Sequence, residues 1–212
     1  MSLEIELKLL LAATDTRRFM AHPCLRAAIQ RSDQMLDNFY YDTPELALRR
    51  RGVALRLRKQ GRLRLQTIKL AAQSVVSKGL AIRPEWETPF RRTFDFSIVE
   101  DDATRVWLQQ AEIAGRIGQL FRSRFRRVTW HLPLANGGEI LVALDRGEVT
   151  ANGGAIPICE VELELAGSSD IAALHSLAAE LGQRVTLTPS DISKAQRGYA
   201  LLDQPDPRFA EG

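Results

Sequence analysis

The first residues of the chain place three charged side chains on one face of a predicted strand. Residues 4–8 read Glu-Ile-Glu-Leu-Lys, and successive side chains of an extended strand point to opposite faces. Glu4, Glu6 and Lys8 therefore share one face, while Ile5 and Leu7 share the other. Such a pattern is typical of an edge strand with one solvated face. It also suits a site in which two carboxylates bind a hard divalent cation beside an ammonium group.

The same alternation recurs in distant segments, each with charges of mostly one sign. Acidic side chains alternate along residues 159–165 and 84–87, basic side chains alternate along residues 53–58, and residues 141–145 end in one carboxylate. If all these faces pointed to solvent, nothing would favour sorting acids and bases into separate strands. Faces that converge would form one interior with an acidic side and a basic side, which suits a metal-bound polyphosphate.

Turn residues divide the chain into about eight short strands with helices between them. We predict strands at residues 4–8, 37–42, 53–59, 63–70, 81–90, 121–132, 139–146 and 156–165, and helices at residues 14–31, 45–50, 97–118, 169–182 and 190–202. The Asn-Gly pairs at 136–137 and 152–153 are strong hairpin signals and indicate antiparallel neighbours. Eight such strands suffice to close a barrel, which removes exposed edges.

Such a barrel could have either its apolar or its charged side chains inside. We favour a charged interior, because four amphipathic helices are available to cover an apolar exterior and would otherwise lack that role. The charged interior is tolerable only if acids, bases, metal and water satisfy one another. The predicted fold class is therefore α+β: an eight-stranded antiparallel barrel that forms a tunnel with a polar, charged lumen and is covered outside by helices.

Composition argues against several other classes. A net charge of +3 and the lack of interleaved aromatic residues argue against a nucleic-acid-binding module. The chain has no apolar run of membrane-spanning length, and its charged start argues against a secretory signal. Cys24 and Cys159 have no paired spacing, which fits a reducing compartment, and the scattered histidines predict that oxygen atoms hold any metal. We therefore expect a cytoplasmic protein.

Eight short motifs, in this order, resemble the signature of the CYTH, or triphosphate tunnel metalloenzyme, superfamily. They lie at residues 4–8, 39–44, 55–58, 67–69, 83–85, 143–148, 158–165 and 193–199. The resemblance covers residues 1–203 as one CYTH domain, leaves 204–212 as a linker-like tail, and is closest to bacterial inorganic triphosphatases. Those proteins often carry a C-terminal helical domain of the CHAD type. The tail fits either a chain cut after the catalytic domain or a natural single-domain member.

The resemblance implies a function and a set of site residues. The implied enzyme hydrolyses inorganic triphosphate, a small-molecule substrate, to pyrophosphate and phosphate with one or two Mg²⁺ or Mn²⁺ ions. The implied metal ligands are Glu4, Glu6, Glu160, Glu162 and Glu164. The implied substrate-binding residues are Lys8, Arg56, Arg58, Lys69, Arg127 and Lys194. The implied catalytic residues are Lys8, Glu85 and Asp145.

Two positions depart from the family pattern. The strand that carries Arg127 often has two cations two residues apart, but Phe125 occupies the second position here. Leu63 and Leu65 have the same parity as Lys69, which places them in the lumen unless a bulge near Gln66 changes the register.

Two alternatives to this function stay open at this point. Other members of the superfamily hydrolyse or cyclise organic triphosphates such as thiamine triphosphate or ATP, and the phosphate-binding residues would look alike. A non-catalytic polyphosphate-binding module would keep the same cations without turnover. The sequence also leaves open the preferred metal and the oligomeric state, a homodimer included.

Overall fold

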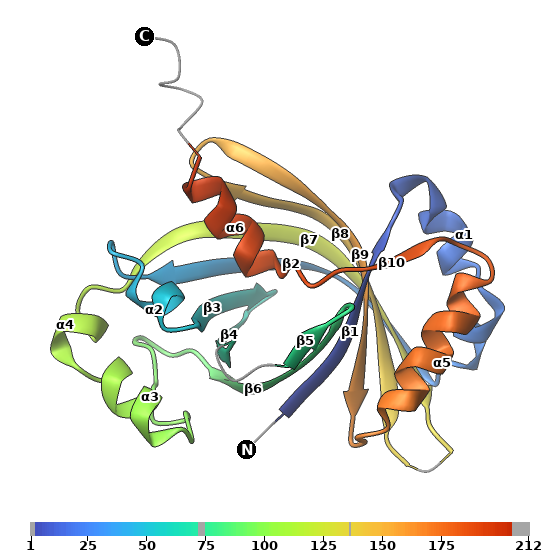
Figure 1. Ribbon diagram of the computed structural model, residues 1–212, viewed down its shortest axis with the longest axis horizontal. Coiled ribbons are helices and arrows are strands. Elements are labelled where there is room, and N and C mark those ends of the chain that lie inside the picture. The colour runs from blue at the N-terminus through green and yellow to red at the C-terminus, as the bar shows by residue number, and fades with distance from the viewer. Residues whose placement is uncertain (1–2, 72–74, 136, 205–212) are drawn as a thin grey trace, which may run out of the picture.

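The computed structural model describes residues 3–71, 75–135 and 137–204 (Figure 1). In chain order its elements are β1 (Leu3–Leu11), the 3₁₀ helix η1 (Ala13–Asp15), α1 (Thr16–Met20), the 3₁₀ helix η2 (Pro23–Ala27), β2 (Gln30–Asp42), α2 (Ala47–Arg50), β3 (Val53–Gln60), β4 (Leu63–Leu70), β5 (Val75–Ser77), β6 (Leu80–Pro89), α3 (Asp102–Leu108), α4 (Ala111–Ala114), β7 (Gly118–Pro133), β8 (Glu139–Ala151), β9 (Gly154–Ala166), α5 (Ile171–Gly182), β10 (Leu187–Pro189) and α6 (Lys194–Leu202). Among the described helices, none has the length and apolar character needed to cross a membrane. The predicted tail, apart from Gln204, and Asn136 of one predicted turn lie outside the described residues.

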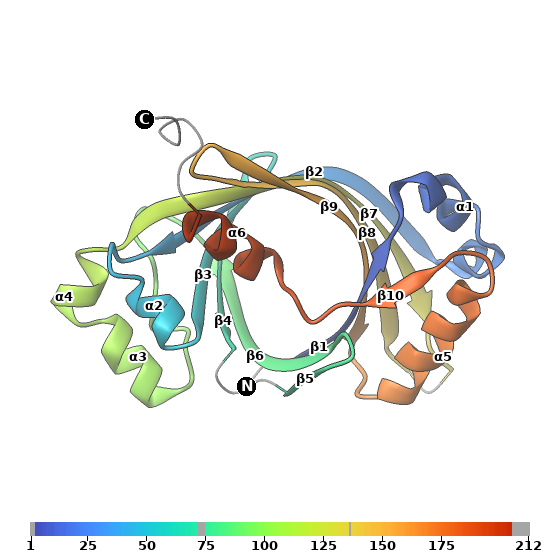
Figure 2. The ribbon, with the colours of Figure 1, turned by 45° about the horizontal axis from the view of Figure 1, so that its top comes forward.

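Eight antiparallel strands close into a barrel in the order β1-β9-β8-β7-β2-β3-β4-β6, with β6 returning to β1. Figure 2 looks into the resulting ring. The closing pairs run from Leu3 opposite Pro84 to Leu7 opposite Leu80. The short strands β10 and β5 extend the sheet beside β1 and β6, respectively. The predicted α+β barrel is confirmed.

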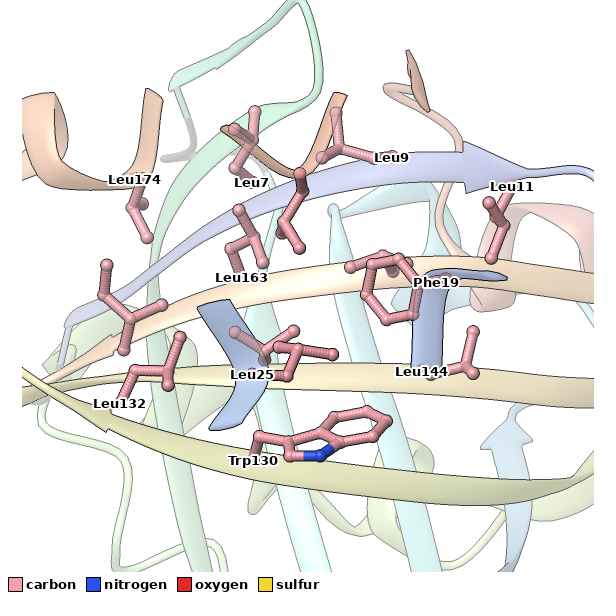
Figure 3. Packing of buried hydrophobic residues seen from close by; sticks show 14 of the residues in the cluster. Leu7, Leu9, Leu11, Phe19, Leu25, Trp130, Leu132, Leu144, Leu163 and Leu174 are labelled. Atoms are coloured by element: carbon pink, nitrogen blue, oxygen red, sulfur yellow. The ribbon is translucent and has the colours of Figure 1, made fainter. Parts of the chain in front are cut away.

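The outward-facing apolar side chains form two cores beneath the helices. Around α1, η2 and α5, one core gathers Leu7 and Leu9 of β1, Leu163 of β9 and Trp130 of β7 (Figure 3). Around α2 and α3, the other core contains Leu48, Leu55, Ile68, Trp86 and Leu108. The helices therefore cover an apolar exterior, as predicted, and the charged side chains of β1, β3, β6 and β9 are left to the interior.

Helix α6 packs against an apolar patch on the inward side of the barrel. Tyr199 and Leu201 of α6 contact a cluster that includes Tyr40 of β2 and Phe121 and Phe125 of β7. These strand residues have the same parity as the lumen charges, since Phe125 and Arg127 are two residues apart on β7. In Figures 1 and 2, α6 lies against β7, β8 and β9 at one end of the ring. One end of the interior is therefore apolar and is covered by this helix.

The long helix predicted at residues 14–31 is wrong. The chain forms η1, α1 and η2 there and enters β2 at Gln30. Pro23 begins η2 and disfavours helical geometry in the residue before it, and His22 is extended, with φ −62° and ψ 133°.

The helix predicted at residues 97–118 is also replaced by shorter elements. Asp101 caps α3 by accepting a hydrogen bond from Thr104 N at 2.8 Å, so the helix begins after the cap. Gln110 is extended, with ψ 136°, and separates α3 from α4. The last helix likewise begins at Lys194 rather than at residue 190, because Ser193 forms its N-cap.

Two local features test the predicted register. Asn152 and Gly153 both have positive φ (49° and 74°) between paired Ala151 and Gly154, which is the two-residue hairpin turn that Asn-Gly favours. The β3–β4 pairing runs without a shift from Val53 opposite Leu70 to Gln60 opposite Leu63. The bulge considered near Gln66 is therefore absent, and Leu63, 47% exposed, lies at a barrel end on the lumen face.

Gly147 allows β7 and β8 to approach closely beside the cavity. A Cβ atom added there would lie 2.1 Å from the carbonyl oxygen of Arg124 and 2.5 Å from Phe125 Cα. We predict that Gly147→Ala lowers the free energy of unfolding by about 2–3 kcal/mol, because backbone atoms have to move. Urea unfolding followed by circular dichroism measures the change. Gly182→Ala is the matched control, because nothing lies within 4 Å of its added Cβ; equal stabilities of the two variants would contradict the prediction.

Candidate active site

A cavity of about 1210 Å³ opens into the barrel, and many of the inward-facing charges line it. All but two of the predicted site residues line it, namely Glu4, Glu6, Lys8, Arg56, Arg58, Lys69, Glu85, Arg127, Glu162, Glu164 and Lys194. Asp145 and Glu160 lie behind the lining and are 0% exposed. The fold thus brings together charges from six strands and from α6.

The carboxylates of β1 are bound by cations from β4 and β6. Lys69 Nζ lies 2.6 Å from Glu4 Oε1 and 2.9 Å from Glu85 Oε2. Arg83 donates to Glu4 Oε2 at 2.7 Å and to Glu6 Oε1 at 2.6 Å. Burial raises the pKa of Glu85, but neighbouring cations, Lys69 first, outweigh it and lower the pKa. This wall is therefore a compensated network of ionised groups.

Glu164 differs from the other lumen carboxylates. It lies opposite Glu6 in the β1–β9 pairing, and within the described residues it has no cation within ion-pair distance. Burial and then the nearby charge of Glu4 raise its pKa to about 7, with Lys69 acting in the opposite direction. A carboxylate with a raised pKa among other carboxylates can gain a bound cation at little cost.

A second cluster surrounds Lys194 of α6. Its Nζ lies 2.6 Å from Asp145 Oδ2, 2.5 Å from Glu160 Oε1 and 2.9 Å from Glu162 Oε1. Arg127 forms a two-bond fork with Asp145, both distances being 2.7 Å, and lies 2.5 Å from Glu162. Burial opposes the charge on Lys194, but the three carboxylates raise its pKa. Lys194 is therefore a fixed cation in the middle of an acidic pocket.

Several contacts fix α6, and with it Lys194, in the barrel. Ser193 and Gln196 form a reciprocal capping box at the first turn. Tyr199 Oη donates to the buried Asp42 Oδ2 at 2.8 Å, and Arg197 donates to Glu160 Oε2 at 2.5 Å. The helix is therefore anchored at both ends.

Lys8 links the two acidic clusters. Its Nζ lies 3.5 Å from Glu6 Oε1 and 3.9 Å from Glu162 Oε1. Its backbone N–H donates to Gly79 O at 2.9 Å, and its carbonyl accepts from Ser190 N at 3.0 Å. Gly79 has φ +84°, and an added Cβ would lie 2.5 Å from Lys8 O. The backbone that carries this ammonium is therefore held closely on both sides.

The basic wall is formed by Arg56 and Arg58 of β3. Arg56 Nη2 donates to Thr67 Oγ1 at 3.0 Å and lies 3.8 Å from Glu85 and 3.7 Å from Glu87. Arg58 Nε donates to Asn38 Oδ1 at 2.9 Å. These groups present cations to the cavity opposite the carboxylates of β1 and β9.

The prediction from sequence omitted several residues that shape this site. Arg83 binds both Glu4 and Glu6, and its alternation with Glu85 and Glu87 on one strand face was a signal available in the sequence. Tyr40 also lines the cavity and stacks on Phe121, with ring centroids 4.7 Å apart. The Asn38 and Thr67 contacts depend on pairings between strands, which no local motif indicates.

The donor set fits a hard divalent cation, which prefers carboxylate oxygens. Two groups of lumen carboxylates are available. Glu4, Glu6 and Glu164 lie on the neighbouring strands β1 and β9, and Glu164 has no cation partner among the described side chains. Oxygen atoms of Asp145, Glu160 and Glu162 lie within 4.8 Å of one another, but Lys194 already binds all three. Apart from Glu164, the carboxylates of both groups are therefore already paired with cations.

A family model of the CYTH domain matches residues 2–199. The chain belongs to the CYTH domain family. The resemblance based on the charged motifs is thereby confirmed, and the charged cavity is the interior of a CYTH barrel.

Comparison with curated proteins gives a relative in Haemophilus influenzae. Its inorganic triphosphatase is 27% identical over 203 residues, which are 93% of this chain and 54% of that protein. The chain therefore spans about half the length of this curated relative.

Solved structures share the fold. A Hippeastrum protein described as an adenylyl cyclase candidate with a dominant triphosphatase activity aligns with a TM-score of 0.65 at 19% identity, covering 93% of this chain and 95% of that chain. A Mimivirus capping enzyme triphosphatase aligns with a TM-score of 0.53 at 10% identity, covering 87% of this chain and 90% of that chain. At these identities the two structures show a common barrel and nothing finer.

The raised pKa of Glu164 predicts a pH-dependent stability. Its folded pKa, about 7, lies above its ordinary value of 4.5, so the folded protein binds more protons than the unfolded chain between these values. Stability from this group is therefore present at low pH and is lost as pH rises through about 7.

We expect the free energy of unfolding of metal-free protein to decrease between about pH 5 and pH 8 by roughly 2 kcal/mol more in the wild type than in Glu164→Gln. Urea unfolding at a series of pH values with a chelator present measures this difference. Glu112→Gln on the exposed face of α4 should follow the wild type. Equal slopes for the wild type and Glu164→Gln would refute the assignment.

Proposed function

We propose that this chain hydrolyses inorganic triphosphate to pyrophosphate and phosphate with a divalent metal ion, Mg²⁺ or Mn²⁺. One observation carries the proposal: a single cavity in which carboxylates of β1 and β9 face cations of β3, β4 and β7. A linear polyanion that binds together with a metal ion requires carboxylates for the metal ion and cationic side chains for the phosphate groups. The activity named for the Haemophilus influenzae relative supports the same reaction.

The proposed metal ligands are Glu4, Glu6, Glu162 and Glu164, which line the cavity. Glu160, also predicted as a ligand, is 0% exposed and lies behind the lining; like Glu4, Glu6 and Glu162, it would have to exchange bound cations before it could bind a metal. When bound, a divalent ion would neutralise phosphate charge and lower the pKa of a bound water. One or two ions fit a donor set of this kind.

Cations on separate strands would hold the phosphate chain straight. Arg56, Arg58, Lys69 and Arg127 project into the cavity from β3, β4 and β7. Their position along the lumen suits successive phosphoryl groups, and phosphoryl transfer depends mainly on such positioning and charge stabilisation. Lys194 adds a further cation from α6.

In the proposed reaction a water oxygen bonds to the terminal phosphorus and the bond from that phosphorus to the bridging oxygen breaks. The electron pair stays on the bridging oxygen, which becomes part of pyrophosphate, and the water releases a proton. We assign Lys8, which lines the cavity, to stabilise the charge on the leaving oxygen. Glu85 orients Lys69 and Arg56. Asp145 orients Arg127 and Lys194. Both carboxylates therefore act through the cations that they bind.

A direct substrate screen distinguishes the proposed function from two other functions. Phosphate release is measured with tripolyphosphate, ATP and thiamine triphosphate, each with Mg²⁺ and with Mn²⁺. We expect tripolyphosphate to give the highest kcat/KM. A preference for ATP or thiamine triphosphate would replace the inorganic substrate with an organic one, and binding without turnover would indicate a non-catalytic polyphosphate module. A fused helical domain and a homodimer stay predictions.

The carboxylate assignment predicts loss of turnover in two single variants. Glu4→Gln and Glu162→Gln should each lower kcat for tripolyphosphate by on the order of 10²-fold or more, because each removes a charge that would bind the metal. Steady-state phosphate release at saturating Mg²⁺ measures the loss, and circular dichroism checks folding. Glu112→Gln removes the same charge from the exposed surface and should keep the wild-type rate. A Glu4→Gln enzyme that stays active without metal would defeat the assignment.

A further inference from the structure

A buried pair of polar side chains lies inside the apolar cluster under α6. Asn38 of β2 and Ser123 of β7 are both 0% exposed, and Asn38 Nδ2 donates to Ser123 Oγ at 3.2 Å. Along their strands, Asn38 lies between Leu36 and Tyr40, and Ser123 lies between Phe121 and Phe125. All four of these neighbours belong to the apolar cluster. Polar groups in such surroundings are costly unless every hydrogen bond is made, so their presence here calls for a reason.

The amide oxygen of Asn38 reaches one lumen cation. Arg58 Nε donates to Asn38 Oδ1 at 2.9 Å. Ser123 fixes the amide from its other end, so the oxygen is directed at the guanidinium. The hydrogen-bond chain Ser123–Asn38–Arg58 thus connects β7, β2 and β3 and sets the direction of Arg58.

Arg58 differs from the other cavity cations in its charge balance. Carboxylate oxygens lie within 4 Å of Lys8, Arg56, Lys69, Arg83, Arg127 and Lys194. Among the described residues Arg58 has no such carboxylate, and its oriented contact is a neutral amide. Burial, followed by the like charges of Arg56 and Arg127, lowers the pKa of Arg58 to about 10, so the group remains a cation at neutral pH.

A partly buried cation without a counter-ion, such as Arg58, is unfavourable, and a bound anion relieves this cost. An aspartate at position 38 would relieve it permanently with almost the same shape. An amide instead orients the guanidinium by a hydrogen bond and leaves its charge available for a ligand.

We propose that Asn38, held by Ser123, is a positioning residue that keeps Arg58 oriented and uncompensated, so that this guanidinium is the strongest anchoring point for a phosphoryl group of the substrate. The inference rests on the proposed function, because it takes a linear polyphosphate as the ligand. It adds to that function a residue with no direct contact to substrate. It also gives a reason for the neutral side chain at this position.

Two variants separate orientation from charge. Asn38→Asp keeps a hydrogen-bond acceptor for Arg58 but adds a neutralising carboxylate. Asn38→Leu keeps the approximate size and leaves Arg58 charged but without its acceptor. Gln119→Glu adds the same negative charge at an exposed position of β7 and is the matched control for Asn38→Asp.

The affinity for tripolyphosphate is measured by isothermal titration calorimetry with a chelator present, and kcat and KM are measured with Mg²⁺. We expect Asn38→Asp to weaken binding about tenfold or more and to raise KM by a similar factor, because a charge-assisted hydrogen bond to the ligand is lost. Its kcat should change by less than about threefold, since ground-state and transition-state binding are weakened alike. The dependence of affinity on salt should also become shallower than in the wild type.

Asn38→Leu should likewise raise KM, while Gln119→Glu should stay within about twofold of the wild-type affinity. A folded Asn38→Asp variant with wild-type affinity and KM would overturn the proposal. So would an Asn38→Leu variant that loses thermal stability and kcat without any change in KM, because that result shows a purely structural role. Wild-type protein that binds tripolyphosphate without hydrolysing it would refute the proposed function alone, since the affinity comparison is still valid. Wild-type protein without affinity for tripolyphosphate would overturn both.

Discussion

The structure depends on mutual compensation of charges inside a closed barrel. Strand alternation sends Glu4, Glu6 and Lys8 inward while Leu7 and Leu9 pack beneath α5 and η2, so the two faces form together. Charges removed from water are costly unless each has a partner. The barrel meets this requirement with ion pairs that cross between strands, such as Lys69–Glu4 and Arg127–Asp145. The same side chains that make the interior tolerable are therefore the ones proposed to bind substrate.

This dual role limits how the cavity can work. A carboxylate already bound by an ammonium or guanidinium group has to exchange that partner before it binds anything else. Among the described carboxylates Glu162 is the most occupied in this respect, with Lys8, Arg127 and Lys194 within 4 Å, whereas Glu164 has no cation partner. On the basic wall, Arg58 is the counterpart of Glu164, because its acceptor is an amide. Among the described cavity residues, these two groups without an opposite charge lie on β9 and β3, where a bound cation and a bound anion would each satisfy one of them.

The sequence was sufficient to predict which side chains of a strand share a face. It was not sufficient to predict which side chains of other strands they contact in the folded protein. Alternation predicted which side chains of each strand share a face, because the period of two is fixed by backbone geometry, and the amphipathic helices available to cover an apolar exterior then favoured a charged interior. Helix lengths were less predictable, since single residues such as Pro23 end an apparent helical pattern. The role of Asn38 could not be predicted, because its partners Arg58 and Ser123 are 20 and 85 residues away and depend on the register of two strand pairs.

Phe125 occupies the position where the family pattern often has a second cation, and its ring packs against a distant part of the chain. A second cation on β7 would lie where this ring packs into the apolar cluster under α6. Lys194 Nζ instead lies 4.8 Å from the ring centroid and reaches Asp145, Glu160 and Glu162 from the last helix. An aromatic face attracts such a cation and also fills the barrel end against water. The C-terminal helix is thus a structural part of the charged cavity, because it supplies a positive charge on the side where β7 has a phenyl ring.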